Sequence, residues 1–165
     1  MDTSSRFIIN LDKVPAEGLN RSWHLDEAFF SALDEQEIER GKLDATLRVT
    51  KASGAYEFHF QVEGYVEVPC DRCLEPMQQP IIAEDTIKVV LGSTLEDDGD
   101  QITVPADKPE VDVAWNLYET IALAIPSFHA HENGNCNTEM TGWLNELEPV
   151  RPQNDSRWDT LRDLL

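Results

Sequence analysis

The chain has 165 residues, of which 41% are hydrophobic, so it can bury the core of one folded domain. Its 32 acidic residues outnumber its 13 lysines and arginines and leave a formal charge of −19. This charge disfavours general nucleic-acid binding through a broad basic face and favours basic protein partners, unless the acidic surface serves solubility alone.

No targeting signal is visible in the sequence. Residues 1–6 lack the basic and apolar regions of a secretory signal, and no apolar run approaches the roughly 20 residues that span a bilayer. The three cysteines are an odd number for a disulfide framework. We therefore expect a protein of the reducing cytoplasm that contacts no membrane.

The N-terminal region predicts a short strand, a loop and a short helix. Residues 7–11 are an apolar strand candidate, and residues 15–20 contain Pro, Gly and Asn, which mark a loop. A helix is expected near residues 26–34, with Asp26 as its N-cap. The buried stripe of this helix would consist of Phe29, Phe30 and Leu33.

The following region predicts an antiparallel hairpin. Apolar and polar residues alternate over residues 43–50 and again over 56–62, and a Gly-containing turn at residues 52–54 separates the two runs. Such alternation is typical of paired strands with one face in solvent. Gly64 then permits a bend or a β-bulge before the chain reaches Cys70.

Residues 81–91 predict the next strand, which is long enough to be twisted or bulged. Residues 92–110 are acidic and rich in turn formers, and they predict an acidic loop with at most a brief strand at 101–104. Two later segments, residues 127–153 and 155–165, predict an irregular tail and a short C-terminal helix.

The main helix is expected at about residues 112–125. Asp112 can cap its start, and Pro126 ends it. Trp115 and Tyr118 are expected to anchor the helix in the core. Together these elements predict a single α+β domain with a mostly antiparallel, twisted sheet that curls toward a partial barrel.

A Cys-x-x-Cys turn is the most informative motif of the chain. Cys70 and Cys73 can hold one soft metal ion between them. His131 and Cys136 in the tail would complete a four-ligand zinc site, and His129 is a substitute ligand. Such a site would tie the tail to the sheet.

Two other interpretations of this turn remain open. Cys70 and Cys73 could be a redox pair, although the acidic surroundings and the absence of a following helix disfavour a thioredoxin-type site. They could also be small buried side chains in a structural turn. No phosphate-binding Gly loop or catalytic motif is present, so we expect a protein that is not an enzyme and takes no small-molecule substrate.

Three further residues are candidates for partner binding. Arg72 could contact a phosphate or a partner carboxylate, or form an internal salt bridge with a nearby acidic residue. Arg157 and Trp158 could stack on a base or contact a partner, or they could cap and pack a short terminal helix.

Four features in order resemble the YceD-like family of large ribosomal RNA subunit accumulation proteins. They are a Cys-x-Arg-Cys turn directly after a hairpin (residues 70–76), a helix that ends in a Leu-Ala-Ile-Pro step (123–126), a tail with His and Cys, and a terminal Asp-x-Arg-Trp (155–158). This order of features covers roughly residues 40–165, and we expect residues 1–165 to form a single domain of this kind.

Membership of this family would imply a cytoplasmic protein needed for normal accumulation of large-subunit ribosomal RNA, with no established reaction. The partner expected from the resemblance and the charge is a basic large-subunit ribosomal protein or a pre-ribosomal particle. Direct binding of ribosomal RNA is one alternative. A zinc- or thiol-dependent enzyme of unknown reaction is another.

Overall fold

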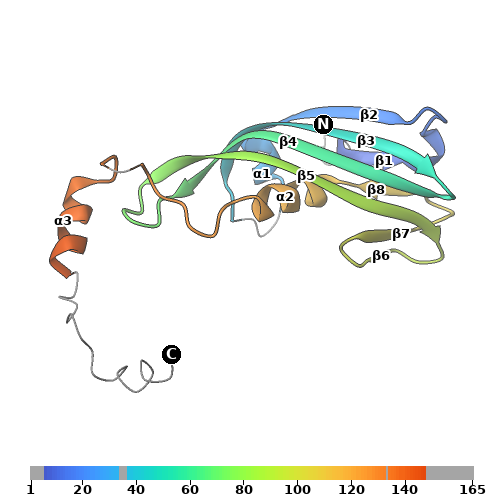
Figure 1. Ribbon diagram of the computed structural model, residues 1–165. Helices are drawn as coiled ribbons and strands as arrows, with labels where there is room; N and C mark the ends of the chain where they lie inside the picture. The colour runs from blue at the N-terminus through green and yellow to red at the C-terminus, as the bar shows by residue number, and fades with distance from the viewer. Residues whose placement is uncertain (1–5, 34–36, 133, 148–165) are drawn as a thin grey trace, which may run out of the picture.

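A long twisted sheet forms the framework of the molecule, and short elements cover one of its faces (Figure 1). The computed structural model describes residues 6–33, 37–132 and 134–147. The strand order in the sheet is β2-β3-β4-β5-β7-β6, and the sheet is not closed into a barrel. The strands are β2 (Leu19–Leu25), β3 (Arg40–Ala52), β4 (Ala55–Pro69), β5 (Pro76–Gly92), β6 (Glu96–Asp97) and β7 (Gln101–Pro105).

The sheet is mostly antiparallel, as predicted, with one parallel pair between β5 and β7. Strands β3 and β4 meet in a two-residue turn in which Ser53 (φ 51°) and Gly54 (φ 82°) both adopt positive φ. Such a turn matches the right-handed twist of the strands beside it. Strands β4 and β5 form an even longer hairpin that continues beyond the covered part of the sheet and has the Cys turn at its tip.

The core follows from the period-two pattern. Along β3 and β4 every second side chain is buried, and the residues between them face solvent. The largest fully buried side chains in these two strands and in β5 are Leu43, Leu47, Phe58, Phe60 and Ile81. Because one face is apolar and the other is polar, the sheet requires a cover on one side only.

The covering layer consists of two helices and a two-stranded sheet. Helices α1 (Glu27–Ser31) and α2 (Ala114–Leu123) pack on the large sheet. Strands β1 (Ile8–Asn10) and β8 (Glu110–Asp112) pair with each other, and a single 3-10 turn, η2 (Leu11–Lys13), follows β1. Their apolar side chains join the same core.

The predicted N-cap of α1 is confirmed, because the Asp26 carboxylate accepts a hydrogen bond from the Ala28 N–H (3.1 Å). The N-cap of α2 is Val113, one residue later than predicted, and it has no side-chain cap; Asp112 before it accepts a hydrogen bond from the Ala114 N–H (3.0 Å). The prediction that Trp115 anchors the core is wrong, since this side chain is 47% exposed. Tyr118, one helical turn later, is buried, and its hydroxyl accepts a hydrogen bond from the Glu37 N–H.

Several elements differ from the sequence-based expectation. Strand β2 begins at the end of the expected loop and continues over residues 21–25, for which no element was predicted; its buried side chains Trp23 and Leu25 lie opposite residues of β3. The brief strand expected at 101–104 is confirmed as β7, but the acidic segment at 92–110 also contains β6 and the start of β8. Gly64 lies in a register without a bulge, because its missing Cβ allows close approach of β3.

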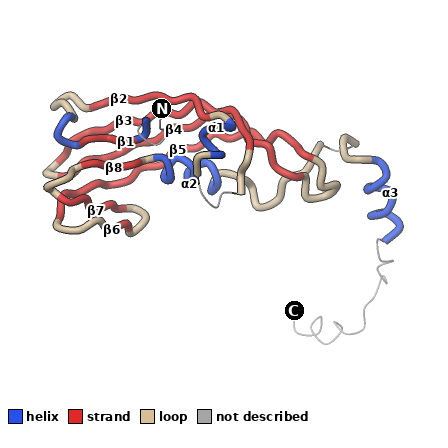
Figure 2. Tube along the Cα trace, turned by 180° about the vertical axis from the view of Figure 1, so that it is seen from behind, coloured by secondary structure: helices blue, strands red, loops and turns tan. Residues whose placement is uncertain are grey.

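The tail at 127–153 is not irregular throughout. Helix α3 (Thr138–Leu147) forms within it and lies apart from the body of the molecule, with no buried residue (Figure 2). The predicted C-terminal helix at 155–165 lies outside the described residues. No helix among the described residues is long and apolar enough to cross a membrane.

Candidate metal centre

The Cys turn connects the ends of β4 and β5 at the tip of their hairpin. The Cys70 N–H donates to the Glu75 carbonyl (2.9 Å), and the Leu74 N–H donates to the Cys70 carbonyl (2.9 Å). Leu74 adopts the left-handed conformation (φ 63°), which lets the chain reverse directly after Cys73. Both cysteine side chains are buried and lie on the side of the turn that faces the tail.

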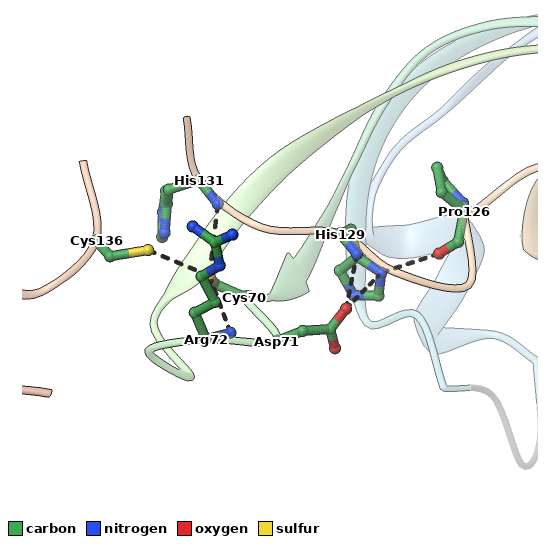
Figure 3. A network of polar contacts seen from close by, with 7 residues as sticks. All are labelled: Cys70, Asp71, Arg72, Pro126, His129, His131 and Cys136. Atoms are coloured by element: carbon green, nitrogen blue, oxygen red, sulfur yellow. Dashed lines mark hydrogen bonds and ion pairs between the residues drawn. The ribbon is translucent and has the colours of Figure 1, made fainter. Parts of the chain in front are cut away.

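A short backbone pairing brings the tail to this turn. The Asp71 N–H donates to the His129 carbonyl (2.9 Å). The Asp71 carboxylate accepts from the His129 N–H (2.7 Å), as Figure 3 shows. The His129 ring turns toward the Pro126 carbonyl (3.1 Å), away from the cysteines. Two residues further along, His131 faces Cys73.

The four predicted ligands meet in space. The donor atoms of Cys70, Cys73, His131 and Cys136 all lie within 4.8 Å of one another. The Sγ atoms of Cys70 and Cys136 are 3.9 Å apart, and Cys73 Sγ is 3.4 Å from His131 Nδ1. Two sulfurs bound tetrahedrally at a Zn–S distance of ~2.3 Å would be about 3.8 Å apart. The donor set could therefore hold a metal ion, and both its chemistry and its spacing fit zinc.

The region that carries the turn and the tail also carries the family signature. Residues 58–165 match the family described as "Large ribosomal RNA subunit accumulation protein YceD". The chain belongs to the YceD family. Comparisons with curated proteins and with solved structures found no match. The family description connects the chain with accumulation of large-subunit ribosomal RNA.

Hydrogen bonds to sulfur polarise the site in this YceD family member. Burial opposes ionisation of Cys70, but N–H groups including those of Arg72 (3.4 Å) and His131 (3.5 Å) point at its sulfur and lower its pKa to about 6. Burial and the neighbouring Cys70 and Cys73 raise the pKa of Cys136 to about 11. Cys70 is therefore the thiol of the cluster that ionises more readily, and Cys136 the one that holds its proton more strongly.

A second contact connects the turn with α3. The Asn137 Oδ1 accepts hydrogen bonds from the N–H groups of Glu139 (2.9 Å) and Met140 (3.2 Å), which caps the helix. The Asn137 Nδ2 donates to the Glu75 carboxylate (2.7 Å). Helix α3 thus begins two residues after Cys136 and is positioned by the same turn that carries Cys70.

The other predicted site residues lie outside the cluster or outside the described residues. His129, the substitute ligand, contacts Asp71 and lies outside the cluster. Arg72 is next to the Phe128 ring, with its guanidinium carbon 5.9 Å from the ring centroid. Arg157 and Trp158 lie outside the described residues.

Sequence reasoning missed Asp71 and Asn137 as supporting residues. Their main contacts cross from the turn to the tail, between residues 58 to 62 positions apart. A single sequence contains no signal for such pairings. The Asn137 cap had a local signal, because Asn followed by Thr and Glu is typical of a helix start.

Proposed function

We propose that this YceD family member is a non-enzymatic ribosome-biogenesis factor that binds a basic large-subunit ribosomal protein or a precursor particle. The family match over residues 58–165 carries the proposal, and the charge of −19 supports a basic partner. An acidic surface accelerates encounter with a basic protein and disfavours contact with free nucleic acid. The protein would screen the charge of its partner until that partner reaches ribosomal RNA.

The outer face of the sheet supplies exposed carboxylates for this role. Asp44 of β3 and Glu57 and Glu63 of β4 all face solvent, and Asp44 lies directly opposite Glu63. Like charges at such short range are unfavourable within the protein itself. A cationic partner segment would relieve this repulsion, which favours binding of lysine and arginine side chains.

Zinc is the metal that we propose for the cluster. Three sulfurs and one imidazole nitrogen are a donor set typical of structural zinc sites, and four protein ligands leave no open position for a substrate or a reactive water. A bound ion would crosslink the tip of the β4–β5 hairpin to the segment before α3. The burial of Cys70 and Cys73 also supports a structural role, because reactive cysteines are usually accessible.

Affinity purification at moderate salt tests the partner proposal. Tagged full-length protein, expressed at its native level, should enrich large-subunit ribosomal proteins or particles over an untagged lysate. The triple variant Asp44→Asn, Glu57→Gln, Glu63→Gln should recover less of them. Its control, Glu17→Gln, Asp98→Asn, Asp107→Asn, removes the same charge from exposed loop positions and should behave like the wild type. Absence of large-subunit components from the wild-type eluate would count against the proposal.

Direct binding of ribosomal RNA is the second candidate function. The arrangement that favours it is Arg72 beside Phe128, whose ring is 60% exposed, since a guanidinium and an aromatic ring together can bind an unstacked base. Ultraviolet crosslinking should distinguish the two functions. Crosslinks to ribosomal RNA that disappear in the Phe128→Ala variant would favour the RNA-binding candidate.

Metal analysis tests the zinc proposal separately. Tag-free protein purified without chelators should contain zinc near one equivalent, and the Cys136→Ser variant should contain much less. In that variant, proteolysis should cut residues 127–147 faster while the sheet stays resistant. If protein purified in this way contains no metal at a level near one equivalent per chain, the zinc assignment is refuted.

A further inference from the structure

One edge of strand β5 has no strand partner along the larger part of its length. Strand β7 pairs only with residues Lys88–Gly92 of β5, at one end of the strand, as Figure 1 shows. The other end, from Pro76 to Ile87, pairs with β4 on one side. In the part of the chain that the structure describes, no strand pairs with its other side.

The strand register identifies which main-chain groups face this open edge. The β4–β5 pairing continues without a bulge from Ala55↔Val90 to Pro69↔Pro76, so N–H and C=O directions alternate regularly along β5. The Lys88 N–H donates to Asp100 on the β7 side (3.0 Å). By this alternation, the main-chain groups of Thr86, Glu84 and Ile82 also point away from β4.

Contacts at both ends of the open edge agree with this assignment. The Thr86 N–H donates to the neighbouring Asp85 carboxylate (2.8 Å), a short-range contact available to a group without a strand partner. Pro80, which has no N–H to donate, occupies an outward-facing position, where proline is tolerated in a strand. Residues 82–86 are therefore the segment at which another strand could pair.

A groove of ≈ 500 Å³ runs along this segment, between β5 and helix α2. It combines exposed apolar side chains with carboxylates: Ile82 is 80% exposed and Leu123 is 83% exposed. The acidic residues that line it are Glu84, Asp85, Asp100 and Glu119.

The charge of the groove selects among the occupants that could pair with β5. A second copy of the chain would place Glu84 and Asp85 next to the same carboxylates of its partner, and its net charge of −19 adds to the repulsion. Residues 148–165 of the same chain contain three arginines and four acidic residues, so they offer no net positive charge. Phosphate groups of a nucleic acid would be repelled.

We propose that residues 82–86 of β5 accept an extended, lysine- and arginine-rich segment of a protein partner as an additional strand. Main-chain hydrogen bonds to Ile82, to Glu84 and to the Thr86 carbonyl would hold the segment, and Ile82 and Leu123 would contact its apolar side chains. Its basic side chains would face the groove carboxylates. This inference rests on the proposed function, because it specifies where and how the basic partner binds.

A backbone-blocked peptide provides the test. The probe is a synthetic peptide of about nine residues with alternating basic and valine side chains, matched by a copy that is N-methylated at every second residue. N-methylation keeps the charge and removes the N–H groups that strand pairing requires. Fluorescence anisotropy with the full chain should show binding of the first peptide and about tenfold or greater loss for the second.

Two variants at one position separate pairing from charge. Glu84→Gln removes the carboxylate and keeps the N–H, whereas Glu84→Pro removes both and leaves the β4 side of the ladder intact. Glu84→Pro should bind the unmodified peptide about tenfold more weakly than Glu84→Gln. Circular dichroism checks folding. If Glu84→Pro does not fold, the two peptides and amide exchange at Ile82 and Glu84 in the wild type decide the question.

Any of three outcomes would overturn the inference. The two peptides could bind equally well, the two variants could bind the unmodified peptide equally well, or neither peptide could bind. Slower exchange of the Ile82 and Glu84 amides on peptide addition would support it. Affinity purification from lysate reports independently on the proposed function. Recovery of large-subunit proteins together with no difference between the peptides would refute only the binding mode. If the peptide binds by strand pairing but the purification recovers no large-subunit proteins, only the ribosomal assignment is refuted.

Discussion

Asp71 and His129 are paired through two hydrogen bonds, one in each direction, although they are 58 residues apart in the sequence. Asp71 follows Cys70 directly, and His129 lies two residues before His131. The pairing therefore fixes the distance between the two halves of the donor cluster. It belongs to the protein's own hydrogen-bond network, so it would preorganise the cluster for metal.

Replacing Asp71 should weaken metal binding without removing a ligand. The Asp71→Ala variant loses the carboxylate that accepts the His129 N–H (2.7 Å) and keeps only the main-chain bond to the His129 carbonyl (2.9 Å), so the metal must supply more of the ordering of the tail. We expect a zinc affinity roughly 10–100-fold lower, as is typical when a group that supports a metal ligand is lost. Chelator competition measures it. Asp98→Ala, in an exposed loop, is the control, and equal affinities for both variants would contradict the role of Asp71.

Zinc affinity should rise with pH. The pKa of Cys70 is lowered from 9.0 to about 6, so below pH 6 protons compete with the metal at this sulfur. The pKa of Cys136 is raised to about 11, so at neutral pH this thiol must release its proton when metal binds. Between pH 6 and 8 the affinity should therefore rise about tenfold or more per pH unit. Competition titrations at several pH values check this, and an affinity independent of pH would refute it.

Helix α3 should depend on its N-cap. Asn137→Ala removes the acceptor for the Glu139 and Met140 N–H groups and the contact with Glu75. We expect a loss of about 1 kcal/mol in helix stability, typical of a lost cap. Amide exchange of residues 139–142 should accelerate correspondingly. In Asn145→Ala, an exposed control on the same helix, exchange should stay the same or slow, because alanine favours helix.

Gly64 should not tolerate a side chain. It has φ 152°, and a Cβ there would meet the Lys42 carbonyl oxygen and approach the Leu43 Cα to 2.6 Å. Because both contacts are with backbone of β3, the strands would have to separate. We expect Gly64→Ala to destabilise the fold by roughly 2–4 kcal/mol. Denaturant unfolding measures this, and Gly142→Ala, with no neighbour within 4 Å of its Cβ, should not lower stability.

The framework could be predicted from the sequence because its signals are local. Alternation along residues 43–50 and 56–62 predicted the β3–β4 hairpin, Asp26 predicted the N-cap of α1, and Asp112 predicted the start of α2 to within one residue. Elements without a regular pattern were missed. Strand β2 has only Trp23 and Leu25 as buried residues, and α3 buries none, so its existence depends on its cap and on its own helix propensity.

The four donors could be predicted because thiols and imidazoles are few in this chain, so Cys70, Cys73, His131 and Cys136 were the natural set. The choice between His131 and His129 depended on a backbone pairing that sequence does not reveal. The open edge of β5 was equally hidden, because it follows from where β7 stops pairing. Residue type predicts chemistry, whereas main-chain geometry determines which groups are accessible.

The pairing of β1 with β8 affects the order in which the chain can fold. Ile9 lies opposite Val111, so the first strand has no partner until residues about 100 positions later have been synthesised. The β3–β4–β5 meander needs only neighbouring segments and can form early. During translation Ile9 therefore waits for its strand partner until residue 111 has been made, whereas Phe7 can already contact Trp23 and Phe29. Pairing of β1 with β8 would follow formation of the meander.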